Sequence, residues 1–265
     1  MAKGKFDMSE FLTPVEGVPE SDTTREIAVN DILDNPLNFY PRPDNEKLAE
    51  LMESIQANGM LEPPTVVPAE NGKYRLISGH SRMNAVRLLA SYKDDAVAER
   101  FQRVLCRVLP SMTTEQEECA VIEANRQRIK SPAVLAQEAE RLTQIYIKRR
   151  EAGEDLPGRI RDRVAEAMQV NKTKLANLSA IKNGLKVPGI RRAWEEGRLP
   201  EAAALEIARM DDNTQYRLLD WMIDNGKPWA IKNVQEFVKT RAKDEQAAED
   251  EKYIELLGHI RRSGS

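Results

Sequence analysis

The first half of the chain alternates between helical and extended patterns of apolar residues, which predicts a mixed α+β region. Four apolar residues recur at helical spacing: Leu48, Leu51, Met52 and Ile55. Asp44 precedes them as a predicted N-cap, and Gly59 follows as the residue that ends this helix. A second helix is predicted over 83–90, where apolar residues again recur at helical spacing.

Short runs rich in β-branched residues surround these helices and predict a small sheet. They occupy residues 26–29, 65–67, 74–77 and 104–108. Asn71-Gly72 separates the second run from the third and is a strong signal for a tight hairpin turn.

From Thr114 onward the pattern is helical almost to the last residue, so the fold class is an α+β domain followed by an all-α domain. Ser131-Pro132 predicts an N-cap and a first-turn proline, and Gly197 and Gly226 predict helix ends. We expect a tail over 1–25, an α+β domain over 26–130, a helical domain over 131–210 and a helical C-terminal region over 211–265. An apolar cluster between Tyr253 and Ile260 fits either a short dimerisation element or docking within the chain.

Composition excludes several classes of protein. Among 265 residues there are two cysteines and two histidines, too few for a disulfide framework, and no zinc or haem site is expected. No apolar run approaches the ~20 residues of a membrane span, and the first residues lack the apolar core of a secretory signal. We therefore expect a cytoplasmic protein, with Cys106 and Cys119 as buried small residues.

Charge is distributed unevenly along the chain. Residues 1–60 hold 5 basic and 12 acidic side chains, whereas residues 158–192 hold nine basic and two acidic ones. A basic block in an acidic protein indicates a local site for a polyanion. The alternative is an ordinary solvated helix surface.

The basic block contains a pattern typical of two helices joined by a tight turn. The turn is predicted at 169–171, with Ala165 small enough for a close crossing and Leu175, Leu178 and Ile181 as the inner face of the second helix. Such a pair is either a DNA-reading helix-turn-helix or an ordinary helical hairpin. In the first case the residues expected to contact DNA are Arg161, Lys172, Thr173, Lys174, Asn177 and Lys182.

The segment 79–82, Gly-His-Ser-Arg, lies between a predicted strand and a predicted helix. Backbone N–H groups at such a junction attract anions, and Arg82 is suited to clamp a phosphate. Alternatively, Arg82 pairs with a carboxylate in a purely structural turn. His80 is a candidate phosphate ligand, a candidate pH switch, or a turn residue with satisfied hydrogen bonds.

Several blocks in series resemble the ParB family of partition proteins over about residues 27–210. They are Asn35-Pro36 with Pro41-Arg42, the helix and turn from Leu48 to Pro63, the strand and box from Gly72 to Arg82, the segment from Ile122 to Pro132, the helix pair, and 195–199. The resemblance implies a ParB/sulfiredoxin-like N-terminal domain followed by a helix-turn-helix domain. Sulfiredoxin chemistry itself is not expected, because the equivalent box has no cysteine.

The resemblance also implies a ligand and partners. Many relatives bind CTP with Mg²⁺ in the N-terminal domain and close as a sliding clamp on double-stranded DNA. A homodimer, a partition ATPase as partner, and association with the nucleoid or a plasmid follow from the same resemblance. The nucleotide-binding residues would be Gly59, Leu61, Gly79, His80, Ser81, Arg82, Asn125 and Arg128, with Glu123 or Asn125 at the metal and Glu123 as the catalytic candidate.

Two departures from the family pattern bear on this expectation. The box reads Gly-His-Ser-Arg where the family has Gly-Glu-Arg-Arg, and Ala124 separates Glu123 from Asn125. One added residue turns a helical side chain by about 100°, which argues against nucleotide hydrolysis. The leading interpretation is a sequence-specific partition protein. The alternatives are a transcriptional regulator of a mobile element, a nucleotide hydrolase, or a module whose acidic tail recruits a partner.

Overall fold

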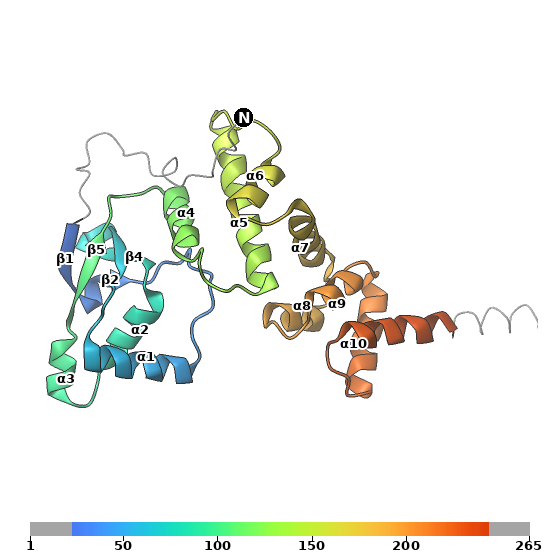
Figure 1. Cartoon of the computed structure of the whole chain (residues 1–265), viewed down its shortest axis with the longest axis horizontal. Helices are drawn as coiled ribbons and strands as arrows, with labels where there is room; N and C mark the ends of the chain where they lie inside the picture. Colours follow the sequence, from blue (N-terminus) through green and yellow to red (C-terminus); the bar gives the residue numbers. More distant parts are fainter. Residues whose placement is uncertain (1–22, 244–265) are drawn as a thin grey trace, which may run out of the picture. The chain divides into compact units, whose positions relative to one another are not determined.

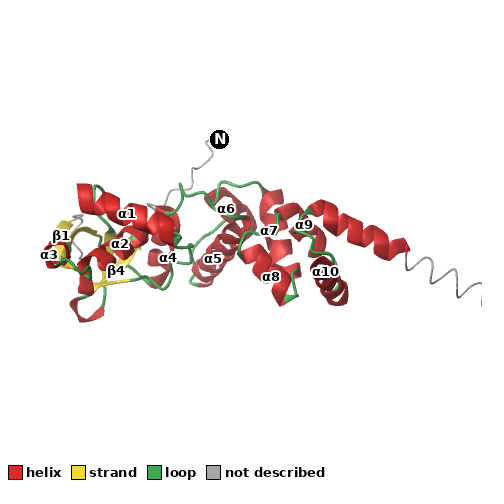
Figure 2. Ribbon diagram, turned by 90° about the horizontal axis from the view of Figure 1, so that it is seen from below, coloured by secondary structure: helices red, strands yellow, loops and turns green. Residues whose placement is uncertain are grey.

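A computed structural model describes residues 23–243 of the chain. They fall into two compact units that divide after Ile129 (Figure 1). Within the described residues, strands occur in the first unit and the second is helical (Figure 2). The predicted fold class is therefore confirmed. The proposed dimerisation element near Tyr253 lies outside the described residues.

The first unit is built on a five-stranded mixed sheet with the strand order β1-β5-β3-β4-β2. Strands β1 and β5 pair antiparallel, as do β3 and β4, while β3–β5 and β2–β4 are parallel. The elements are β1 (Thr23–Ala28), β2 (Ile32–Leu33), α1 (Asn45–Asn58), β3 (Thr65–Pro68), β4 (Tyr74–Ser78), α2 (His80–Ala90), α3 (Asp95–Arg100), β5 (Arg103–Val108) and α4 (Thr114–Ala124).

Most predicted elements of this unit are present, with three differences. Strand β1 begins at Thr23, inside the predicted tail, because Thr23 pairs with Val108 of β5. Helix α2 begins at His80 and not at residue 83, so the anion-binding box forms its first turn. The two-residue strand β2 and the short, charged helix α3 were not predicted, because neither carries an apolar period.

Local signals explain helix α1 and the hairpin. Asp44 caps α1 by accepting a 2.9 Å hydrogen bond from the backbone N–H of Lys47, and Gly59 ends the helix at φ 72°. The β3–β4 turn has φ 57° at Asn71 and 72° at Gly72, the left-handed conformations that this residue pair favours. Helices α1 and α2 pack on each other, and Ile55 is buried in the core they share with the sheet.

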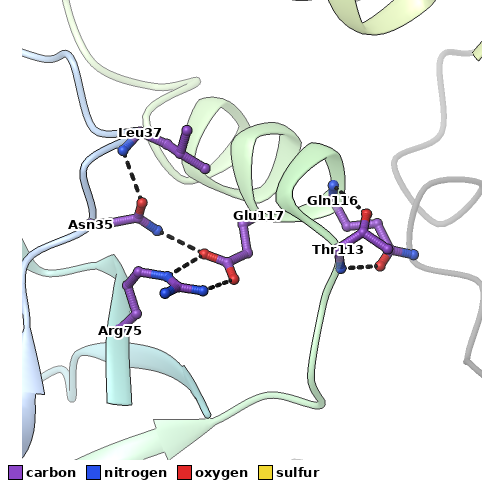
Figure 3. A network of polar contacts seen from close by, with 6 residues as sticks. All are labelled: Asn35, Leu37, Arg75, Thr113, Gln116 and Glu117. Atoms are coloured by element: carbon purple, nitrogen blue, oxygen red, sulfur yellow. Dashed lines mark hydrogen bonds and ion pairs between the residues drawn. The ribbon is translucent and has the colours of Figure 1, made fainter. Parts of the chain in front are cut away.

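A buried polar network joins α4 to the sheet (Figure 3). Glu117 is 2% exposed and binds the guanidinium of Arg75 on β4 through both carboxylate oxygens, at 2.7 and 2.5 Å. Asn35 donates to the same carboxylate at 3.3 Å and accepts from the N–H of Leu37 at 3.0 Å. At the start of α4, Thr113 and Gln116 form a reciprocal capping box. The network fixes α4 and the loop that follows β2, which are two walls of the cavity described below.

The second unit consists of consecutive helices around its own apolar core. They are α5 (Pro132–Glu151), α6 (Ile160–Ala167), α7 (Lys172–Gly184), α8 (Pro188–Glu195), α9 (Glu201–Ile207), α10 (Asp212–Asp224) and a last helix described over 231–243. Ser131 caps α5 and Pro132 opens it, as predicted. None of the helices among residues 23–243 is long and apolar enough to cross a bilayer.

Two residues hold the C-terminal end of α7 in place. The fully buried side-chain amide of Gln215 donates to the carbonyls of Gly184 (2.8 Å) and Met210 (3.1 Å) and accepts from the N–H of Lys186 (3.0 Å). Gly184 lies so close to α9 that a Cβ there would stand 2.3 Å from the carbonyl oxygen of Ala208. The absence of a side chain at residue 184 therefore permits this helix contact.

Candidate functional site

A cavity of about 590 Å³ opens in the first unit at the junction of β4 and α2. Its walls are the junction itself, the loop before α1, the end of α4 with the turn that follows, and one residue of β5. Its polar and charged lining includes Asn38, Arg42, Glu62, His80, Ser81, Arg82, Arg107, Glu123, Asn125 and Arg128. Six of the eight predicted nucleotide-binding residues thus lie around one cavity.

The shape of the junction depends on Gly79. This residue adopts φ 88°, which L side chains rarely adopt, and a Cβ on it would lie 2.9 Å from the Cβ of Pro64. Gly79 is the N-cap of α2 and, having no side chain, makes no side-chain cap bond to the first N–H groups of the helix. The first N–H groups of a helix have no partner within it, and together with the helix dipole they favour an anion.

His80 and Asn38 carry the clearest sign of a ligand. The Nε2 atom of His80 and the Oδ1 atom of Asn38 are buried without a hydrogen-bond partner, and both residues line the cavity. Burial lowers the pKa of His80 to about 4, so the imidazole is neutral at pH 7. His80 is therefore not a turn residue with satisfied hydrogen bonds. Buried polar atoms are nearly always paired, which indicates that a polar ligand or water completes both.

Arg82 pairs with a carboxylate, as one of the two predicted alternatives has it, and also faces the cavity. Its guanidinium pairs with the Glu62 carboxylate at 3.0 Å and also donates to the Glu62 carbonyl. The same side chain lines the cavity. Because a guanidinium has five N–H donors in a fixed plane, the contact with Glu62 positions Arg82 and leaves donors for an anion.

Arg42 and Arg128, which also line the cavity, are held in a similar way. Arg42 donates to Asp34 at 2.6 Å, and Arg87 binds the other oxygen of Asp34 at 2.6 Å. Burial acts to raise the pKa of Asp34, but Arg87 and Arg42 outweigh it and hold that pKa below its usual value. Arg128 donates to the carbonyl of Pro41. Sequence reasoning missed Arg42 as a site residue, although it had marked Pro41-Arg42 as a motif.

The predicted metal and catalytic residues are engaged elsewhere. The carboxylate of Glu123 pairs with Arg126 at 2.8 Å, one turn further along the chain. Asn125 ends α4, and its side-chain amide donates to the carbonyl of Val121 at 2.9 Å. Within residues 23–243, no cluster of three or more His, Cys, Asp or Glu side chains is placed to hold a metal ion. The positive charge of Arg126 beside Glu123 disfavours a Mg²⁺ ion at this carboxylate.

Gly59 and Leu61 are not part of the cavity wall. Gly59 ends α1, and Leu61 is 90% exposed. Arg107 and Asn38 are wall residues that sequence reasoning did not single out. Arg107 stands in the exposed phase of the alternating burial pattern of β5, a signal that the sequence does contain.

In the second unit, α6 and α7 form the predicted helix pair. The buried residues at its centre are Val164, Ala165, Leu175, Leu178 and Ile181. The turn passes through Gln169 at φ 56°, and Asn171 caps α7 by accepting from the N–H of Lys174 at 2.7 Å. At the end of α6, Ala167 is buried and Met168 is only partly buried.

The six predicted DNA-binding residues do not form one solvent-facing set. Arg161, Lys172 and Thr173 are exposed, while Lys174, Asn177 and Lys182 are half-buried. Lys174 precedes the buried Leu178 by four residues, so it lies at the edge of the inner stripe of α7.

All three lysines of α7 are paired with carboxylates of the same unit. Lys172 binds Asp162 of α6 at 2.9 Å, and this hydrogen bond lowers the pKa of Asp162. Lys174 binds Glu201 of α9, and Lys182 binds Glu140 of α5. Arg161 has no hydrogen bond or salt bridge to another described residue.

Comparisons with known proteins agree with this architecture. Residues 15–125 match the sequence model of the ParB N-terminal domain. A nucleoid occlusion protein of Geobacillus thermodenitrificans is 28% identical over 211 residues, which cover 78% of this chain and 66% of the relative. A probable chromosome-partitioning protein ParB of Helicobacter pylori is 24% identical over 216 residues, covering 81% and 65%. The matches thus span just under two thirds of these relatives.

One solved structure has the same fold. The C2221 form of a Pnob8-like ParB-N domain matches with a TM-score of 0.55, covering 86% of this chain and 97% of that one. The two sequences are 11% identical, so this likeness concerns the fold alone.

Proposed function

Because the chain is ParB-like along most of its length and carries a ParB N-terminal domain, we propose that it is a partition-type protein that binds double-stranded DNA through α6 and α7. In this proposal the two helices act as a helix-turn-helix, with α7 in the major groove. The observation that carries it is the exposed set at the start of the pair, Arg161, Lys172 and Thr173, within a segment of nine basic and two acidic residues.

The roles of these residues differ by their chemistry. Arg161 and Lys172 supply positive charge for backbone phosphates, and Thr173 presents a hydroxyl and a methyl group to base edges. Asn177 lies one turn further along α7, on the face that carries Thr173. Because it is half-buried, only part of its side chain is available to DNA. Each lysine of α7 is already paired with a carboxylate that a DNA phosphate would have to replace: Lys172 with Asp162, Lys174 with Glu201 and Lys182 with Glu140.

A mobility-shift experiment tests the DNA proposal. The full chain is titrated with the DNA that flanks its own gene, against unrelated duplexes of equal length, at several salt concentrations. We expect one preferred site and an affinity that falls with salt at a slope of about −0.9 per phosphate contacted. Equal binding to every duplex would contradict sequence-specific recognition, and absence of binding at low salt would contradict the whole proposal.

The second part of the proposal is a nucleotide in the cavity of the first unit. The specific observation is the pair of unpartnered buried atoms beside the arginines. The Oδ1 atom of Asn38 is an acceptor, so the ligand must bring an N–H or O–H donor as well as negative charge. A nucleotide such as CTP has both, since the base or ribose donates while the phosphates meet Arg42, Arg82 and Arg128.

Calorimetry with CTP, ATP and GTP tests this ligand. Heat with one base and not with the others would show that the base is recognised as well as the phosphates. No heat with any of them, for a folded protein, would remove the nucleotide and leave the DNA proposal intact. We do not assign hydrolysis, because the carboxylate of the catalytic candidate, Glu123, is paired with Arg126.

The alternative output of the same helix pair is transcriptional regulation of a mobile element. A plasmid-loss assay and a promoter-reporter assay with Thr173→Ala separate the two. Faster plasmid loss supports partition, and altered expression from an adjacent promoter with normal inheritance supports regulation. A homodimer and a partition ATPase as partner belong to the partition proposal, and gel filtration and pull-down are their direct tests.

A further inference from the structure

We propose that the cavity of the first unit neutralises its anionic ligand with fixed arginines alone and does not require a divalent cation. This inference rests on the proposed nucleotide site and adds to it a statement about charge. It predicts a nucleotide affinity that is insensitive to Mg²⁺ and to chelators.

The cavity wall carries an excess of positive charge. Arg42, Arg82, Arg107 and Arg128 line it, against two carboxylates, Glu62 and Glu123. His80 is neutral and adds no charge. The open N-terminus of α2 contributes further positive potential.

The arginines are positioned before any ligand arrives. The guanidinium of Arg42 is bound to Asp34, that of Arg82 to Glu62, and that of Arg128 to the Pro41 carbonyl. Each of these contacts uses one terminal nitrogen. Because a guanidinium has five donors, the three groups keep N–H bonds for an anion and lose little side-chain freedom when it binds.

The carboxylates are poorly suited to a metal. Mg²⁺ in nucleotide sites is held by phosphates and one or two carboxylates. Glu123 is committed to Arg126, and Glu62 is committed to Arg82. Each carboxylate gives one oxygen to a guanidinium, so a cation bound at the other oxygen would lie beside that positive charge. Asn38 offers the cavity a buried, unpartnered oxygen, Oδ1, but this atom belongs to a neutral amide.

The experiment is calorimetric titration of the full chain with CTP, once with Mg²⁺ and once with EDTA. We expect dissociation constants that agree within about threefold. Arg128→Gln should weaken binding about tenfold or more in both conditions, because it removes charge-assisted hydrogen bonds. The matched control is Arg103→Gln, since Arg103 also donates to a backbone carbonyl of this unit, that of Glu26, but is not part of the cavity wall.

The outcomes separate the two proposals. Binding with Mg²⁺ and none with EDTA would overturn metal independence and keep the nucleotide site. Equal loss in Arg128→Gln and Arg103→Gln would overturn the role of the cavity arginines. No binding in either condition, with a normal thermal unfolding midpoint, would overturn both proposals. If Arg128→Gln does not fold, Arg42→Gln replaces it, because its anchor Asp34 keeps Arg87 as a partner.

Discussion

The cavity of the first unit and the α6–α7 pair of the second both gather basic side chains, but they hold them differently. In the cavity, arginines are anchored by one nitrogen each and still point donors at a common space. On α7, each lysine places its single ammonium on a carboxylate of a neighbouring helix. An anchored arginine keeps further donors in a fixed plane for an anion, whereas a paired lysine is a point charge that a carboxylate already offsets. A count of basic residues does not reveal this difference.

Gly79→Ala is expected to have the largest effect, because it should disable the cavity and leave the helix pair intact. The left-handed φ and the 2.9 Å approach to Pro64 together should destabilise the first unit by about 3 kcal/mol. The control is Gly72→Ala, which has a similar φ but nothing within 4 Å of the added Cβ, and should cost about 1 kcal/mol. Urea unfolding measures both. Equal costs would show that the contact with Pro64 is unimportant.

The next largest difference is expected between two ion pairs. Glu117→Gln leaves Arg75 facing a neutral amide in the interior and should cost about 2 kcal/mol of unfolding free energy, discounted because Arg75 is 33% exposed. Glu201→Gln removes the partner of Lys174 at a more accessible site and should cost less than about 1 kcal/mol. Chemical denaturation of both variants provides the comparison. A larger loss from Glu201→Gln would reverse our ranking of the two pairs.

His80→Leu should change two properties of the cavity in opposite directions, raising stability and lowering CTP affinity. Removing an unpaired buried nitrogen should raise stability at pH 7 by about 1 kcal/mol, while CTP affinity should fall about tenfold through the lost ligand contact. Thermal unfolding and calorimetry measure the two quantities. Unchanged CTP affinity would mean that the buried nitrogen serves water and not the ligand.

The same variant should change the pH dependence of unfolding. The folded-state pKa of His80, about 4, lies below its ordinary value of 6.5, so the unfolded chain binds more protons between these pH values. The protonation of His80 therefore leaves the free energy of unfolding unchanged above pH 6.5 and lowers it as the pH falls toward 4. Urea unfolding across this range should show a shallower decline in His80→Leu, with wild type as the reference. Parallel declines in His80→Leu and wild type would contradict the burial of the His80 imidazole.

The smallest expected effect concerns DNA. Arg161→Ala should lower affinity about fivefold and reduce the salt slope by about one, because Arg161 is exposed and makes no hydrogen bond or salt bridge within residues 23–243. Lys174→Ala should change affinity less than about twofold, because its charge is already neutralised by Glu201. Fluorescence anisotropy at several salt concentrations measures the DNA affinity of both variants and its salt slope. A greater loss in Lys174→Ala would show that DNA displaces the carboxylate.

Local signals made much of the fold predictable. Asp44, Asn71-Gly72 and Ser131-Pro132 act within a few residues, and each element they predicted is present. Pairing over long distances was not predictable. Lys182 binds Glu140 across 42 positions and Lys174 binds Glu201 across 27, so a single sequence does not reveal that they are neutralised. Arg42 and Asn38 were missed because an irregular loop brings them to the cavity.

The close approach of Gly184 to Ala208 has a consequence for evolution and for protein engineering. A single added methyl group at residue 184 would meet a backbone carbonyl and not a movable side chain. To relieve that collision, one helix would have to swing away from the other, and the whole of α7 would change its tilt. Glycine at residue 184 therefore sets how closely α7 approaches α9, and a substitution there would change the orientation of the exposed side of α7.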